Sequence, residues 1–88
     1  MKLKAGIIME KAGDGFIAVA TGEASRSFNG FIRNNKTADF IFRQLVEERT
    51  EEQLVEALLE KYDVTREIAE RDVKAVIEKI RSVGILDD

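Results

Sequence analysis

The stretch Ser27-Phe-Asn-Gly-Phe-Ile-Arg-Asn-Asn-Lys-Thr-Ala-Asp-Phe-Ile-Phe42 changes its hydrophobic period halfway along its length. Residues 28–33 follow the two-residue alternation that is typical of a strand. The polar residues 34–36 favour a turn. After Thr37, the apolar side chains are spaced as on one face of a helix: Phe40, Ile41, Leu45 and Val46. The stretch therefore predicts a strand that runs almost directly into a helix, with the other segments packed around this corner.

Two β-prone runs precede the corner. Residues 3–11 and the apolar run Phe16–Ala20 are separated by a turn signal at Asp14-Gly15, which favours an antiparallel hairpin. The polar residues 21–26 are expected to form a loop that leads to the strand at 28–33. These runs predict a three-stranded antiparallel sheet whose last strand has no partner on one side.

Three helices are expected after the sheet, each beginning at a threonine N-cap. Thr37 caps a helix that runs to about Glu48, Thr50 forms a capping box with Gln53, and Thr65 caps the last helix. Gly84 is placed to end that helix as a C′ glycine. The predicted fold is α+β, three strands followed by three helices, in a single domain spanning residues 1–88.

The last helix has an apolar stripe that we expect to face mainly the core. Asp72 and Lys79 border this stripe on one side, and Ile77 widens it on the other. The stripe itself comprises Ala69, Val73, Val76, Ile80 and Val83.

The composition argues against catalysis and metal binding. The 88 residues include no cysteine and no histidine, so disulfides, thiolate chemistry and the commonest general base are absent. The serine and threonine hydroxyls therefore have no histidine to activate them. No calcium-loop spacing of carboxylates occurs either. We expect no enzymatic activity, no cofactor and no metal.

Charge and hydropathy argue against nucleic-acid and membrane partners. The net charge is −3, and the acidic half is residues 47–88, with thirteen Asp/Glu against seven Lys/Arg. A nucleic-acid-binding domain normally carries a concentrated basic helix or patch instead. No apolar run approaches the roughly 18 residues of a membrane span, and no signal peptide is visible. A cytoplasmic protein is therefore expected.

Residues 28–42 resemble the central signature of the PqqD-like family, a strand followed by Leu-Asn-(Glu/Lys)-Thr-Gly-Ala and a hydrophobic segment ending in Trp. The segments that also resemble this family are Thr50–Val55, Tyr62–Val64, Asp72-Val73 and Gly84–Leu86. Asn34 stands where the family usually has Leu, Ala38-Asp39 replaces Gly-Ala, and Phe42 replaces Trp.

The resemblance implies a RiPP recognition element with a winged-helix-like fold. Such domains act as peptide chaperones in natural-product biosynthesis. They bind the leader segment of a ribosomally made precursor peptide and present the precursor to a modifying enzyme, in many pathways a radical SAM protein. The resemblance further implies that the leader adds as a strand beside the third β-strand and that its side chains enter a groove against the last helix.

The candidate peptide-binding residues come from the last strand and the last helix. Gly30 would let a second backbone approach closely, or it marks a bulge or twist of the sheet. Arg33 would pair with an acidic leader, or it keeps an exposed edge soluble. Asp72 and Lys79 would fix polar groups of the peptide, or they form a solvated helix edge. The full candidate set is Phe28, Asn29, Gly30, Phe31, Ile32, Arg33, Asp72, Val76 and Lys79.

Two alternatives remain at this point. A winged-helix DNA-binding or transcription-related module has a similar order of elements and would bind duplex DNA through a basic helix. An unfilled strand edge also allows an edge-paired or strand-swapped homodimer in place of a monomer.

Overall fold

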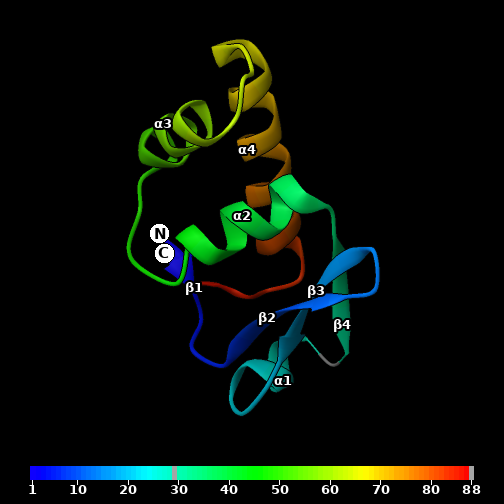
Figure 1. The fold of residues 1–88 in the computed structure, drawn as a ribbon. Helices are drawn as coiled ribbons and strands as arrows, with labels where there is room; N and C mark the ends of the chain where they lie inside the picture. Colours follow the sequence, from blue (N-terminus) through cyan, green and yellow to red (C-terminus); the bar gives the residue numbers. More distant parts are fainter. Residues whose placement is uncertain (29, 88) are drawn as a thin grey trace.

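A computed structural model describes residues 1–28 and 30–87 of the chain. Its centre is an antiparallel sheet with the strand order β2-β3-β4, formed by β2 (Ile7–Ala12), β3 (Gly15–Ala20) and β4 (Phe31–Asn34) (Figure 1). The predicted three-stranded antiparallel sheet is therefore confirmed. The hairpin between β2 and β3 turns at Gly13 and Asp14, where Gly13 adopts a positive φ of 62° that favours glycine.

Strand β4 is shorter than the pattern of residues 28–33 predicts. It begins at Phe31, because Gly30 has a φ of 132° and bends the chain just before the strand. A side chain at this position would strain the backbone even though there is open space around it. Gly30 thus separates Phe28 from the edge strand.

Three long helices follow the sheet, as predicted: α2 (Lys36–Gln44), α3 (Glu51–Lys61) and α4 (Arg66–Ser82). The capping box of Thr50 with Gln53 and the cap at Thr65 are confirmed. The predicted cap at Thr37 is wrong. The side chain of Asn35 accepts a hydrogen bond from the Ala38 amide at 2.8 Å instead, because an asparagine at the end of the strand reaches the first turn equally well.

Helix α2 ends at Gln44, earlier than the predicted Glu48. The segment after it turns back toward the N-terminus, where the Leu3 amide donates to the Leu45 carbonyl at 2.8 Å. Gly84 follows α4 with a φ of 77°, as expected for a glycine that ends a helix.

Three short elements were not predicted. Helix α1 (Ala24–Ser27) occupies part of the expected loop at residues 21–26, and Ala24 is buried in it. Strands β1 (Lys2–Leu3) and β5 (Leu86–Asp87) pair antiparallel and bring the two ends of the chain together. Two-residue strands and a one-turn helix are too short to produce a periodic pattern.

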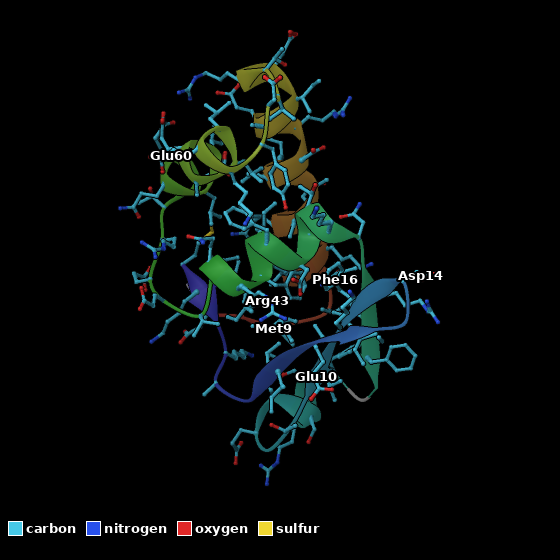
Figure 2. All side chains as sticks on the ribbon, viewed as in Figure 1. Met9, Glu10, Asp14, Phe16, Arg43 and Glu60 are labelled. Atoms are coloured by element: carbon cyan, nitrogen blue, oxygen red, sulfur yellow. The ribbon has the colours of Figure 1, made fainter. Side chains whose placement is uncertain are left out.

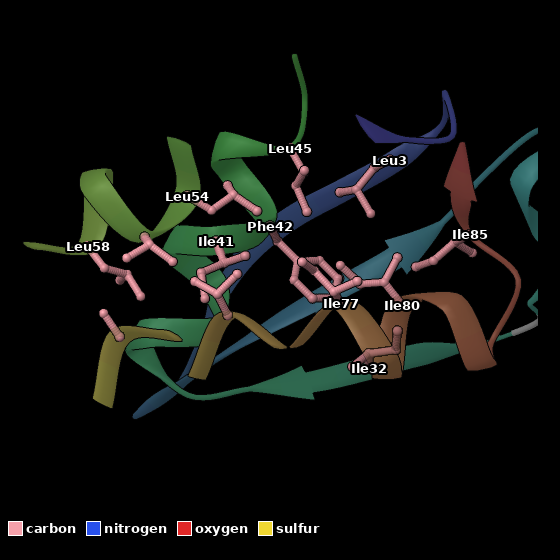
Figure 3. Packing of buried hydrophobic residues seen from close by; sticks show 14 residues of the cluster. Leu3, Ile32, Ile41, Phe42, Leu45, Leu54, Leu58, Ile77, Ile80 and Ile85 are labelled. Atoms are coloured by element: carbon pink, nitrogen blue, oxygen red, sulfur yellow. The ribbon is translucent and has the colours of Figure 1, made fainter. Parts of the chain in front are cut away.

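The core lies between one face of the sheet and the three long helices (Figures 1 and 3). Phe42 of α2 is fully buried at its centre, and Ile32 contributes from β4. On α4 the buried residues are Ala69, Val73, Ile77 and Ile80. Val76 lies at the margin of this stripe and is only partly buried. Within the described residues, no helix is both long and apolar enough to cross a membrane.

Candidate functional site

Strand β4 forms one edge of the sheet. Within the part of the chain that the structure describes, only β3 pairs with it, so its other side is open. Ile32 and Asn34 point to the core side and are 4% and 8% exposed, whereas Phe31 is 57% exposed and Arg33 is exposed beside it. The predicted unpartnered edge is therefore present, over four residues.

The hydrogen-bonding phase of the sheet determines which backbone groups face this open side. In an antiparallel ladder, pairs that exchange two hydrogen bonds alternate with pairs that exchange none. The Thr21 amide donates to the Gly6 carbonyl at 2.8 Å, and Ile8 and Val19 form the pair two positions further along. Ile8 and Val19 are therefore a hydrogen-bonded pair, and the backbone of Val19 is directed toward β2.

The same alternation extends to β4. Val19 is opposite Phe31 in the register, and because Val19 bonds to β2, this second pair exchanges no hydrogen bonds. The amide and carbonyl of Phe31 consequently face the open edge, and so do those of Arg33, two residues further along. This edge offers two donors and two acceptors to an incoming strand.

A shallow hollow lies where β4 passes into α2. Its volume is about 160 Å³. One wall is the first turn of α2, with Asn35, Thr37 and Ala38, and the other is the middle of α4. The α4 residues that line it are Asp72, Ala75 and Val76. The apolar part of the hollow is small, so the hollow suits a single side chain of modest size. A hydroxyl and a carboxylate lie nearby.

The three candidate residues on α4 share one face of the helix, because they are spaced four and three residues apart. Asp72 and Val76 line the hollow. Asp72 is half-buried, with one carboxylate oxygen 3.6 Å from Nε of Arg71. Lys79 is exposed one turn further along and does not line the hollow. The candidate residues of α4 thus extend as a row from the hollow.

The structure separates the predicted strand residues. Phe31 and Arg33 are at the open edge, and Ile32 packs in the core beneath it. Phe28 is not in the strand: it is extended, partly buried and packed against the core. Gly30 is an exposed bend. Asn29 lies outside the described residues.

Sequence reasoning missed the contribution of α2 to the hollow. Thr37 was interpreted as a cap, whereas the structure places it and Ala38 in the wall. Ala75 also lines the hollow and is not among the residues predicted to bind the peptide. Its position next to Val76 on a helix face that borders an open strand is the signal that identifies it.

Asn34, where the family usually has leucine, is a core residue rather than an edge residue. Its side chain lies on the inner face of β4, and its amide nitrogen finds no hydrogen-bond partner in the described structure. A buried donor without a partner costs roughly 1–3 kcal/mol. Asn34 therefore influences stability more directly than it influences a ligand at the edge.

The opposite edge of the sheet, along β2, is partly covered. Arg43 of α2 donates to the carbonyl of Met9 at 3.4 Å, and its Nε donates to the buried carboxylate of Asp39 at 2.8 Å. Figure 2 shows Arg43 next to Met9, on the side of β2 that faces α2. This contact also confirms the bonding phase, since the Met9 carbonyl must point away from β3 to accept it.

The clearest electrostatic perturbation lies away from both edges. Arg66, the first residue of α4, donates to the carboxylates of Glu52 and Glu56 on α3. The hydrogen bond and charge of Arg66 lower the pKa of Glu56, and Glu56 in turn raises the pKa of Arg66. This group of charges connects α3 to α4 at the surface.

Two solved structures share this fold. One is described as TbiB1 in complex with the TbiA(beta) leader peptide, with a TM-score of 0.74 and 18% identity over 99% of this chain and 95% of that chain. The other, lasso peptide synthetase B1 complexed with the leader peptide, has a TM-score of 0.70 and 24% identity over 96% and 93%. At these identities the likeness establishes the fold.

No curated protein matches the sequence significantly. A family profile does match, described as Coenzyme PQQ synthesis protein D (PqqD), over residues 17–86. The match spans most of β3, all of β4 and all three long helices, which contain the open edge and the hollow. The chain therefore belongs to the PqqD family.

Proposed function

We propose that this protein binds the leader segment of a ribosomally synthesised precursor peptide as an additional strand beside β4. The observation that carries the proposal is the open edge, where the backbone groups of Phe31 and Arg33 face outward without a partner strand in the described structure. Strand addition at such an edge is a recurrent mode of peptide recognition. In both solved structures of the same fold, the protein is bound to a leader peptide.

The edge supplies only part of the binding free energy. Each of the up to four backbone hydrogen bonds contributes about 1 kcal/mol net, so the edge contributes about 4 kcal/mol. A micromolar complex requires about 8 kcal/mol. Burying one apolar side chain adds roughly 1.5–3 kcal/mol. The leader therefore also needs side-chain contacts, and a side chain in the hollow between α2 and α4 would supply one of them.

The two faces of the added strand have different environments. A leader side chain that points to the core side, like that of Ile32, is directed toward α4. A strand that continues past Arg33 reaches the hollow, where Val76 supplies an apolar contact and Asp72 a carboxylate. Arg33 and Lys79 would attract acidic groups of the leader. We propose these four as ligand contacts, and Phe31 as the side chain that covers the outer side of the strand.

We further propose that the protein has no catalytic role and delivers the bound precursor to a modifying enzyme, of the radical SAM class. Strand addition uses backbone groups and one small pocket, and the threonine hydroxyl in that pocket has no histidine to activate it. Among the described residues, no cluster of three or more acidic side chains is positioned to hold a metal ion.

An NMR titration tests the proposal. The labelled protein is titrated with the synthetic leader of a small precursor peptide encoded beside its gene. We expect the amides of Phe31–Asn34, together with Thr37, Ala75 and Val76, to shift at micromolar peptide. The substitution Ala75→Leu should fill the hollow and weaken binding about 10-fold, the equivalent of about 1.4 kcal/mol.

A matched control is Ala57→Leu, because Ala57 is a helical alanine of α3 away from the edge, and it should leave binding unchanged. No shift in Phe31–Asn34 at high micromolar peptide would contradict the proposal. So would shifts confined to other surfaces.

A further inference from the structure

The outer face of the sheet is unusually apolar. The helices cover one face, and the other consists of two rows of side chains that run across the three strands. The first row is Ile8, Val19 and Phe31, and the second is Glu10, Ile17 and Arg33. A sheet that faces water on one side normally carries polar residues there. Four of these six side chains are apolar.

The exposed fractions show that this face is open to solvent at both outer strands. Ile8 is 47% exposed and Phe31 is 57% exposed, one on each outer strand, with Val19 half-buried between them. Figure 2 places Glu10 on the side of β2 opposite to Met9, away from α2. A contiguous apolar patch of this kind marks an interaction surface more often than isolated surface residues do.

The charges at the ends of the second row point to the partner. Glu10 lies on β2, Arg33 lies on β4, and Ile17 of the central strand lies between them in register. When a second copy is packed face to face about a two-fold axis parallel to β3, its β2 lies over β4 of the first copy. Glu10 of each copy then lies over Arg33 of the other, and Ile8 lies over Phe31.

We propose that the outer face of the sheet is an isologous interface between two copies of this chain. The interface is self-complementary in both respects: apolar row meets apolar row, and each of the two charges meets its opposite. Two sheets that pack face to face in this way, with strands nearly aligned, form a common arrangement of β-sandwiches.

This arrangement differs from a dimer paired through the edges of the sheet. An edge-paired dimer would consume the backbone groups of Phe31 and Arg33, the same groups that we propose bind a leader. A face-to-face dimer leaves the backbone groups of both open edges and both hollows free, and it shares with the leader only the outward side chains of Phe31 and Arg33. The proposal does not depend on peptide binding, and the two can be tested separately.

The size of the face predicts a weak dimer. Three short strands present an area well below the roughly 800 Å² per partner of a standard interface. Association is therefore expected to increase with protein concentration over about 10 μM to 1 mM, the regime of small transient interfaces. Sedimentation velocity and NMR relaxation measure it over this range.

Charge exchange provides the decisive experiment. Glu10→Lys and Arg33→Glu, made singly, place like charges opposite each other and should each weaken association about 5- to 10-fold. The double variant restores the opposite charges and should return the dissociation constant to within about 3-fold of the original. Ile8→Asp should abolish dimerisation. Circular dichroism confirms that each variant is folded.

A matched control and a competition experiment complete the test. Glu60→Lys makes the same charge change on the exposed side of α3, distant from the sheet (Figure 2), and should not alter association. A peptide that binds the β4 edge and has no acidic side chain beside Arg33 should leave the dimer intact. A protein that stays monomeric at about 1 mM, a double variant that fails to recover, or a dimer that dissociates when such a peptide binds would each overturn the proposal.

Discussion

The two edges of the sheet differ in how their backbone groups are covered. By the same alternation, β2 directs the amides and carbonyls of Ile7, Met9 and Lys11 outward, as β4 does those of Phe31 and Arg33. On β2 the guanidinium of Arg43 donates one hydrogen bond to the Met9 carbonyl and another to the Asp39 carboxylate. On β4 the described structure provides no such cover, and a hollow lies at the end of the strand.

This difference indicates that the open edge is a property of β4 and not of the sheet as a whole. Exposed strand edges promote aggregation, and proteins usually block them with charged side chains or covering segments. Among the described residues, this blocking contact is present on β2 and not on β4. The β4 edge also has the hollow between α2 and α4 at the end of the strand.

The largest effect is expected from proline at the open edge. Arg33→Pro removes an outward amide without breaking the ladder to β3, and its ring obstructs an incoming strand. We expect leader binding to weaken at least about 10-fold, measured by calorimetry. Arg33→Ala separates the contribution of the side chain.

The matched variant at the other edge is Lys11→Pro, which removes an equivalent outward amide of β2. It should fold and bind the leader like the original protein. An equal loss of leader affinity in the Lys11→Pro and Arg33→Pro variants would show that binding is not specific to β4.

The next effect is on stability at the covered edge. Arg43→Ala leaves the Asp39 carboxylate, 6% exposed, without its ion-pair partner and exposes the Met9 carbonyl. Because the arginine side chain is half exposed, we expect a loss of about 1–2 kcal/mol rather than the larger cost of a fully buried pair. Urea denaturation measures it. Arg33→Ala, at the open edge, should change stability by no more than about 0.5 kcal/mol.

A smaller effect of opposite sign is expected beneath the open edge. Asn34→Leu removes a buried donor that has no partner and introduces the residue that the family usually has. We expect the free energy of unfolding to rise by about 1 kcal/mol, with peptide affinity nearly unchanged. A loss of affinity without a change in stability would instead show that the asparagine contacts the ligand.

The smallest effect lies away from both edges. Arg66 lowers the pKa of Glu56. The ionised Glu56 carboxylate therefore stabilises the folded state at pH values above its ordinary pKa. This stabilisation is lost as the pH falls through the lowered pKa that Glu56 has in the folded state. Arg66→Ala should raise the pKa of Glu56 toward its ordinary value, measured by NMR titration. Both glutamate and arginine are exposed, so the effect on stability should be slight and should leave the difference between the edges unchanged.

Local patterns predicted most of the secondary structure. The alternation in residues 28–33, the turn near Asp14 and the threonines at 50 and 65 each depend on near neighbours in the chain, so they can be recognised from the sequence. The Thr37 cap failed because Asn35 competes for the same helix start. Helix α1 and the pairing of the chain ends were not predicted, because packing against segments distant in the sequence stabilises them.

Only part of the candidate site could be predicted in the same way. The open strand followed from its position as the third of three, and Asp72 and Val76 followed from the helical period of α4. The wall contributed by Thr37 and Ala38 required the packing of α2 against α4. The direction of the backbone groups required the register of β2 on β3, which connects residues far apart in the sequence.

The sequence by itself determined the order of the three sheet strands and the three long helices, two of the three caps and the absence of histidine and cysteine chemistry, because these depend on residue type and short-range spacing. The tertiary structure alone decided which backbone groups of the open strand face outward, and that Arg43 covers the Met9 carbonyl on the opposite edge. Strand order, hydrogen-bonding phase and the reach of Arg43 to Met9 arise only when segments distant in the sequence pack together, and they leave Phe31 and Arg33 facing outward.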